Sequence, residues 1–338
     1  MRIVISSPVS QTATAGPATV LRELTTAYEA LGDEVHAVTF SSLEKKLPIG
    51  LRQLIFFVRV LPRCFFADVV LMLDPASTGP AMALAAWITG RRSLVRIGGD
   101  FLWESYVERT GKQILLSEFY LSARSLSLRE KSIFFATRIT LTLATDVVFT
   151  TQWQRTLWQQ PYAFKKGNVH IVLNPLLPGM SSTPAEGKIF LCAHRNARIK
   201  NSEIMKEVWD IVATEAPEAV LDERNRTPEE YAQALASCYA VVLPSLSEVS
   251  PNAILEAIAH HKPFVMTRDT GLQAEVLAGG FLVNTRNAHD LAKAILALCF
   301  DETYKQKVEA MATGTAQTSW SAVAGRYRRI LSSTPTHP

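Results

Sequence analysis

Two glutamates, Glu248 and Glu256, frame a short polar loop in the C-terminal half of the chain. The apolar run 240–243 predicts a buried strand before them, and Ser250 as a cap with Pro251 at the first helical position predicts a helix that carries the second acid. A carboxylate on this apolar helix is costly unless it is hydrogen-bonded or faces a wet cleft. The two carboxylates, with free backbone N–H groups between them, could hold sugar hydroxyls, a diphosphate and ribose hydroxyls in a row. Two solvated surface acids remain the alternative.

A basic loop lies upstream, between a predicted strand at 188–193 and a helical pattern through 204–212. This loop carries Arg195, Arg198 and Lys200. Because the N-terminal end of a helix is already positive, cations gathered there indicate an anion between them, although a basic surface loop is the alternative. Breaking a sugar–phosphate bond leaves extra negative charge on the diphosphate, and fixed cations would stabilise that charge in the transition state.

The sequence shows no arrangement typical of a metal site. It contains no Asp-x-Asp triplet, no Cys pair at ligand spacing and no His-x-x-x-His. If Arg195 and Lys200 stabilise the developing charge, no metal is needed for this step. We therefore expect no metal and no other cofactor, with a nucleotide diphosphate sugar as the donor substrate.

The composition is that of a compact protein with two domains. The chain has 338 residues, of which 48% are hydrophobic and 20% charged, enough for two buried cores. Its four cysteines are scattered and mostly lie in apolar runs, which favours reduced thiols in the cytoplasm. The opening MRIVISSP predicts a first strand rather than a signal peptide, and no apolar run approaches the length of a spanning helix.

Strand and helix patterns alternate through the N-terminal half, which implies a doubly wound parallel sheet. The predicted strands are 2–6, 34–40, 69–73, 93–97, 146–150 and 168–173. A stretch rich in Pro, Ser and Gly, 176–186, predicts the linker to a second domain. No Gly-x-Gly-x-x-Gly follows the first strand, which argues against a dehydrogenase.

The glutamate motif resembles the C-terminal signature of the retaining glycosyltransferases of family GT4, which have the GT-B fold. That signature is a Glu, seven residues, a second Glu and a Lys-Pro-Val-like strand, and here Glu248, seven residues and Glu256 are followed by Lys262-Pro263-Phe264-Val265. The resemblance implies that Glu248 contacts the donor sugar and Glu256 the nucleotide ribose. It also implies that Arg195 and Lys200 hold the donor diphosphate.

The chain departs from the family pattern at two places in this motif. The family has a Gly before the Lys-Pro step, where this chain has His261, and a Gly-rich stretch after the first Glu, where it has Ser250-Pro251-Asn252. We count Ser250, Asn252 and Ala253 among the substrate-binding residues that the resemblance implies.

Two further positions follow from the resemblance in the N-terminal half. The loop at Gly16-Pro17 corresponds to the family's small-residue loop that faces the donor phosphate. The segment RIGGDFLWE at 96–104 looks like the Gly-Asp-x-x-Trp-Glu segment of one GT4 subgroup. It places Asp100 at the carboxyl end of a parallel strand, where such folds bind ligands, as a candidate catalytic residue. The alternative is that Asp100 caps the next turn.

The resemblance covers nearly the whole chain and implies an α/β protein of GT-B type, with two doubly wound Rossmann-like domains facing each other across a cleft. Residues 1–178 would form the acceptor-side domain and 179–314 the nucleotide-sugar domain. Residues 315–338, with Trp320, would form a helix that returns to the N-terminal domain. Base recognition would use the loop 223–227.

The positive charge lies mainly in the N-terminal half. Residues 1–179 contain 19 Lys and Arg against 13 Asp and Glu. The segments 45–66 and 115–139 interleave cations with large apolar residues and predict basic amphipathic helices, which could lie on an anionic membrane surface or simply cover the sheet. Nucleic acid is a less attractive partner, because the net charge of +4 is modest and no reader motif is visible.

We therefore expect a hexosyltransferase that transfers a sugar from a nucleotide diphosphate sugar to a saccharide or lipid-linked acceptor, in cell-envelope polysaccharide or glycoconjugate synthesis. The protein would be cytoplasmic, with peripheral attachment to the inner membrane face. The alternative is a GT-B protein that binds a nucleotide sugar without transferring it, or an isomerase on the same scaffold.

Overall fold

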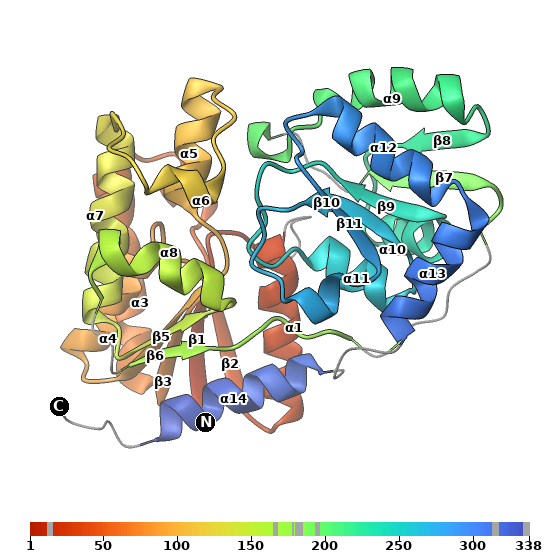
Figure 1. The fold of residues 1–338 in the computed structure, drawn as a ribbon. Coiled ribbons are helices and arrows are strands. Elements are labelled where there is room, and N and C mark those ends of the chain that lie inside the picture. The colour runs from red at the N-terminus through yellow and green to blue at the C-terminus, as the bar shows by residue number, and fades with distance from the viewer. Residues whose placement is uncertain are drawn as a thin grey trace. The chain divides into compact units, whose positions relative to one another are not determined.

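The computed structural model describes residues 1–11, 16–164, 168–177, 179, 185–192, 197–312 and 318–333. Its contacts divide the chain into two compact units, each built on one parallel sheet (Figure 1). The first unit comprises Met1–Leu102, Ser125–Asn174 and Trp320–Pro338, and the second comprises Trp103–Arg124 and Pro175–Ser319. The short segment Trp103–Arg124 therefore groups with the second unit, although the sequence placed it with residues 1–178.

The first unit has a six-stranded sheet in the order β2-β1-β3-β4-β5-β6, and every paired neighbour is parallel. The four inner strands of this sheet are almost entirely buried, as parallel strands covered by helices must be, whereas the two outer strands are partly exposed. The strands are β1 (Arg2–Ser6), β2 (Glu34–Val38), β3 (Val69–Met72), β4 (Arg92–Ile97), β5 (Asp146–Phe149) and β6 (Val169–Ile171).

Two groups of helices are associated with this sheet. Helices α1 (Gly16–Ala30) and α14 (Trp320–Ser332) pack together, and both contribute to a core with β1, β3, β4 and β5. Helix α4 (Gly79–Ile88) packs between α3 (Ile49–Phe66) and α7 (Leu128–Leu143). The remaining elements of this unit are α2 (Ser42–Lys45) and α8 (Gln152–Tyr162), while α5 (Phe101–Thr110) crosses the boundary between the units.

The second unit has a five-stranded parallel sheet in the order β11-β10-β9-β7-β8. Its strands are β7 (Lys188–Cys192), β8 (Ala219–Asp222), β9 (Ala240–Leu243), β10 (Phe264–Thr267) and β11 (Gly280–Val283). Its helices are α6 (Leu116–Phe119), α9 (Ile204–Glu215), α10 (Pro228–Ser237), α11 (Asn252–Ala259), α12 (Ala288–Leu298) and α13 (Asp301–Ala312), with 3₁₀ turns at Arg198–Lys200 and Ala274–Leu277.

The structure confirms the predicted fold class, two Rossmann-like α/β domains with parallel sheets. Two local predictions were wrong. Pro251, rather than Ser250, is the N-cap of α11, and its side chain makes no capping hydrogen bond. The segment 115–139 is not one helix, because Ser127 and Glu130 form a capping box that starts α7 at Leu128.

His261 lies in the turn between α11 and β10 with a φ of 53°, in the left-handed region. A side chain at such a position clashes with its own backbone, whereas glycine does not. The glycine that the GT4 pattern has here is thus explained by backbone geometry. His261 is exposed, so its side chain gains little from packing to offset the strain.

We expect His261→Gly to raise the free energy of unfolding by about 0.5–1 kcal/mol, since relief of left-handed strain exceeds the added entropy of the unfolded chain. Urea unfolding measures this change. His261→Ala is the matched control, because alanine keeps the strained backbone while losing the imidazole. A gain in stability for the alanine variant as large as that for glycine would contradict the explanation.

Candidate functional site

Lys200 and Glu248 meet at the carboxyl ends of two neighbouring strands, β7 and β9. The Lys200 Nζ atom lies 2.5 Å from Glu248 Oε1, and the two side chains are only 19% and 10% exposed. Lys200 closes a 3₁₀ turn after β7, and the Leu246 N–H donates to the Ile199 carbonyl at 2.9 Å, which ties this turn to the loop after β9. Ligands of parallel α/β sheets bind at this edge.

The backbone on both sides of Glu248 is held in place. The Glu248 N–H donates to the Asp269 carbonyl at 3.0 Å, and the Gly271 N–H donates to the Glu248 carbonyl at the same distance. These bonds fix the direction in which the carboxylate leaves the chain.

The neighbours Ser247 and Asp269 form a support that the sequence did not indicate. The Ser247 hydroxyl donates to Asp269 Oδ2 at 2.5 Å and accepts from the Leu116 N–H at 2.8 Å. The Ser117 N–H also donates to Asp269 Oδ2, at 3.3 Å. Partners separated by 22 to 152 positions leave no spacing pattern by which a single sequence could reveal them.

The segment Trp103–Arg124 makes further contacts near Lys200 within the second unit. The Gln113 amide donates to Asn201 Oδ1 at 3.2 Å, and the Arg198 N–H donates to Glu108 Oε2 at 3.1 Å. The Arg286 guanidinium donates to both carboxylate oxygens of Glu118 at 3.1 Å. Residues of this segment therefore help to hold the loop that carries Lys200 in place.

Helix α11 presents the remaining predicted residues of this unit. Asn252 and Ala253 open the helix, Ser250 precedes it, and Glu256 lies one turn further on; all four are partly exposed. Because the cap supplies no side-chain acceptor, the first-turn N–H groups are suited to an anion. Glu256 has hydrogen-bonding or electrostatic contacts, which keeps a carboxylate tolerable on an otherwise apolar helix.

The loop after β8 is organised around Asp222. Arg224 donates to both of its carboxylate oxygens, at 3.0 and 2.7 Å, and Arg226 donates to Oδ2. The hydrogen bonds from Arg224 and Arg226 hold the pKa of Asp222 well below its usual range. This cluster shapes the loop 223–227, in which the sequence placed base recognition.

Two predicted residues lie in the first unit. Gly16 is the exposed first residue of α1. Asp100 follows β4 and is 1% exposed, and its Oδ2 accepts a hydrogen bond from the Trp158 indole N–H at 2.7 Å. Such burial favours a supporting role over direct contact with an acceptor. The predicted site therefore divides, with Lys200, Glu248 and the α11 residues in the second unit, while Arg195 lies outside the described residues.

The geometry can be compared with known proteins. Residues 189–301 match the family Glycosyl transferases group 1. This stretch contains β7 through α12 and therefore includes both Lys200 and Glu248. No curated protein matches the chain.

Solved structures with the same fold span nearly the whole chain. Sucrose-phosphate synthase from Thermosynechococcus elongatus shares 16% identity with a TM-score of 0.67, covering 97% of this chain and 98% of that one. A glycosyltransferase from Rickettsia africae shares 14% at a TM-score of 0.64, covering 98% and 99%. A candidate UDP-N-acetylglucosamine 2-epimerase from Listeria monocytogenes shares 14% identity with a TM-score of 0.60, and the match covers 97% of this chain and 94% of that one. At these identities the likeness establishes the fold, which transferases share with an epimerase-like protein.

We expect Asp222→Asn to destabilise the protein by about 1.5–3 kcal/mol near pH 7, since two charge-assisted hydrogen bonds lose their ionised acceptor. Because the folded-state pKa of Asp222 is lowered, its contribution is complete above the ordinary Asp pKa of about 4 and is lost as the pH falls through the lowered value. Urea unfolding at about pH 7 and pH 3 tests this.

The difference in the free energy of unfolding between the wild type and Asp222→Asn should be smaller at about pH 3 than at pH 7. Asp210→Asn, on the exposed face of α9, is the matched control and should change little at either pH. A gap of the same size at both pH values would contradict the assignment.

Proposed function

We propose that this protein is a retaining glycosyltransferase of the GT4 type, which transfers a hexose from a nucleotide diphosphate sugar to a saccharide or lipid-linked acceptor. The observation that carries the proposal is the largely buried Lys200–Glu248 pair at the carboxyl ends of β7 and β9. It lies inside the stretch that matches the glycosyltransferase family.

The pair supports a division of labour in the transfer step. Lys200, with Arg195, would stabilise the negative charge that grows on the departing diphosphate, and the N-terminal turn of α11 would add N–H donors at Asn252 and Ala253. Glu248 would bind the donor sugar, and Glu256 would accept hydrogen bonds from the ribose hydroxyls. This scheme needs no metal ion.

The ion pair also explains how two charged side chains remain stable in the site when no donor is bound. Two mostly buried opposite charges neutralise each other, whereas either one left alone would be costly. A bound diphosphate would take over as the partner of Lys200 and release Glu248 toward the sugar.

We expect Lys200→Ala to lower turnover of the matching sugar nucleotide by about a hundredfold or more, since one preorganised cation is lost from the transition state. A screen of UDP-, GDP-, ADP- and CMP-sugars by thermal shift first identifies the donor. Release of free nucleotide then reports turnover, in the presence of a chelator as well as without one. The control is Lys206→Ala, which removes an exposed cation from α9. Near-normal turnover in Lys200→Ala would remove the proposed role.

An isomerase remains the second candidate, because the fold also matches the Listeria epimerase-like protein. The two functions differ in their products. A transferase releases the nucleotide diphosphate, slowly to water and faster with an acceptor, whereas an isomerase converts the sugar reversibly without consuming sugar nucleotide. Product analysis in the donor assay separates them.

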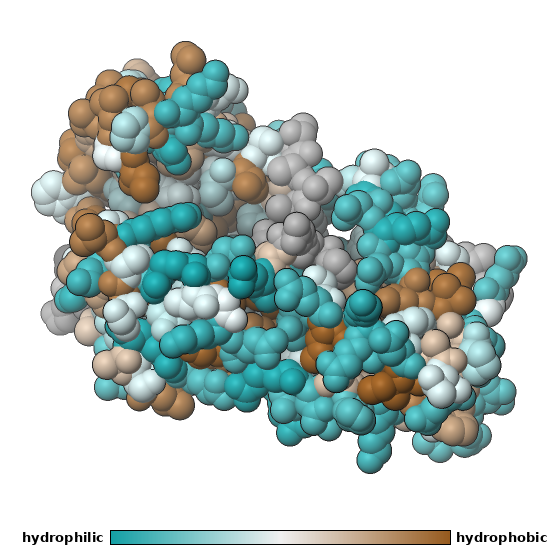
Figure 2. Space-filling model, turned by 90° about the horizontal axis from the view of Figure 1, so that it is seen from above, coloured by the Kyte–Doolittle hydropathy of each residue, from teal (hydrophilic) through white to brown (hydrophobic). Residues whose placement is uncertain are grey.

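The acceptor side is proposed from the surface of α3, α4 and α7. These three helices expose many large apolar side chains: Ile49, Leu51, Leu54, Ile55, Val58, Phe65, Phe66, Leu84, Trp87, Ile88, Leu128, Phe135 and Ile139. Figure 2 shows apolar surface gathered at the left of the molecule, the side on which Figure 1 draws these helices. Exposed apolar surface of this extent marks an interaction site.

The charges on the same helices favour an anionic lipid surface as the partner. Arg63, Arg129, Lys131 and Arg138 are exposed, and Lys45 and Lys46 precede α3. Along the full described length of α3, α4 and α7, the single carboxylate is Glu130, which is buried. No helix in the described part of the chain has both the length and the apolar character that spanning a membrane requires. We therefore propose peripheral attachment and a lipid-linked or cell-envelope saccharide as the acceptor.

We expect the protein to co-sediment with anionic vesicles at low salt and much less with neutral vesicles or at high salt, because each cation near the surface adds about 1 kcal/mol that salt screens. Trp87→Ser and Phe66→Ser should weaken binding by removing inserted rings. The matched control, Val220→Ser, removes an exposed apolar side chain from the second unit. No binding to anionic vesicles at low salt would sink this proposal and favour a soluble acceptor.

A further inference from the structure

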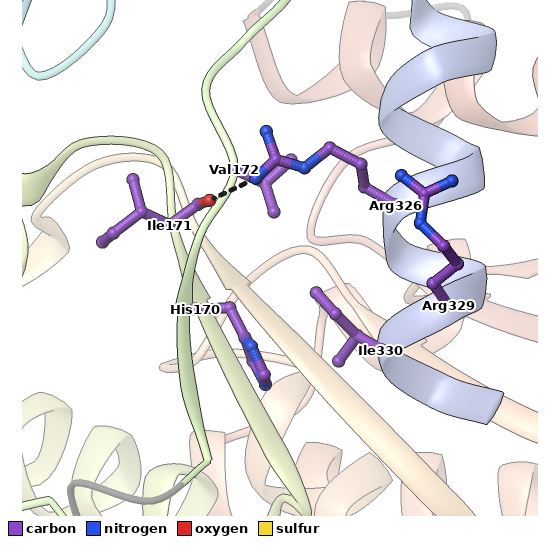
Figure 3. Close-up of a pocket in the computed structure, with 6 residues that line it drawn as sticks. All are labelled: His170, Ile171, Val172, Arg326, Arg329 and Ile330. Carbon is purple, nitrogen blue, oxygen red and sulfur yellow. Dashed lines mark hydrogen bonds between the residues drawn. The ribbon is translucent and has the colours of Figure 1, made fainter. Parts of the chain in front are cut away.

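A pocket of about 280 Å³ lies in the first unit between the edge strand β6 and the last turns of α14. His170, Ile171 and Val172 line it from the strand side, and Arg326, Arg329 and Ile330 line it from the helix (Figure 3). None of these residues belongs to the candidate donor site. The volume is close to the lower end of the range for small-molecule sites, roughly 300–1,000 Å³.

The pocket lies on the open edge of the sheet. Strand β6 pairs with β5 alone, so its other edge turns its backbone groups toward α14. One of these groups, the Ile171 carbonyl, accepts a hydrogen bond from Arg326 Nη2 at 3.2 Å. A basic residue at an edge strand blocks pairing with a further strand. This role explains why Arg326 lies here.

Arg329 is not explained in this way. It lies three positions after Arg326 on the same face of α14, and Figure 3 shows its side chain reaching along the helix toward Arg326. It therefore points away from the carbonyls at the helix C-terminus, which would otherwise stabilise a cation. Figure 3 shows the Arg326 guanidinium reaching across to the Ile171 carbonyl and the Arg329 guanidinium lying beside the helix, so two cationic groups line the pocket together with the apolar side chains of Val172 and Ile330.

The nearby carboxylates already pair with other side chains. Asp146 accepts from His170 Nε2 at 3.1 Å and from Arg92 Nη2 at 2.8 Å, one bond to each of its oxygens. The neighbouring Arg328 pairs with Asp33 at 3.5 Å. Among the described residues, no carboxylate lies within ion-pairing distance of Arg326 or Arg329. The pocket thus has uncompensated positive charge, with an imidazole at its side.

We propose that the pocket between β6 and α14 is a second anion site that binds a phosphate group through Arg326 and Arg329. Planar guanidinium groups match the oxygens of phosphate in paired hydrogen bonds, and two of them suit a dianion. The apolar side chains would carry a small organic group attached to the phosphate. The site is separate from the candidate donor site, because none of the residues that line the pocket is among the residues assigned to the transfer reaction.

Proton NMR tests this site directly, with the C2 proton of His170 as the reporter. His170→Gln identifies the signal by its loss. Inorganic phosphate, added at constant ionic strength, should shift the signal to saturation, whereas chloride should not. Arg326→Gln together with Arg329→Gln should weaken phosphate binding roughly tenfold or more. Both arginines are exposed, so the double variant should fold normally.

Arg328→Gln is the matched control, because it removes the same charge from the same helix on the side of Asp33. This variant and Lys200→Ala should both leave the His170 response unchanged, which separates this site from the donor site. Vesicles with phosphatidic acid, but not phosphatidylcholine, should reduce the response if the phosphate belongs to a lipid; otherwise the ligand is a soluble phosphate. No saturable shift, or equal affinity in the double variant, would overturn the proposal.

Discussion

The pairing of Lys200 with Glu248 is the constraint on which the second unit depends. Two opposite charges that are largely withdrawn from water stabilise a site only if their geometry is held, because either charge left unpaired costs several kcal/mol. The structure meets this requirement with backbone bonds on both sides of Glu248 and with the Ser247–Asp269 support. The parallel strands bring the two residues together, since β7 and β9 end at the same edge of one sheet.

The strands, and hence the place of the site, could be predicted from short apolar runs bounded by turn residues. Glu248 and Lys200 were found because each follows such a run. The support around them was not foreseen, because Leu116 and Ser247 are 131 positions apart and a single sequence carries no signal of that contact. Some ends of helices were also predicted wrongly, because more than one neighbouring residue could occupy the capping position. At the start of α11 the N-cap is Pro251 rather than Ser250, and its side chain makes no capping hydrogen bond.

The exposed faces of α3, α4 and α7 in the first unit differ in their charge from the second unit. In the second unit, cations and carboxylates are paired closely, as in the Asp222 cluster, so that a ligand must exchange with an existing partner. In the first unit, the exposed faces of α3, α4 and α7 offer cations without exposed acids beside them. Paired charges give selectivity for a ligand of matching geometry, whereas unpaired ones attract any anionic surface and respond strongly to salt.

The position of helix α14 in the core of the first unit affects how the chain can fold during synthesis. Val323, Ala324, Tyr327 and Leu331 of this helix are part of the same core as α1, β1 and β3. A ribosome delivers these residues after residues 175–319 of the second unit, so the first unit cannot close its core while that stretch is being synthesised. Folding in the order of synthesis, usual for multidomain chains, is therefore not open to this protein. Its N-terminal sheet must wait with an apolar face uncovered, and a premature stop before residue 320 would leave that face exposed for good.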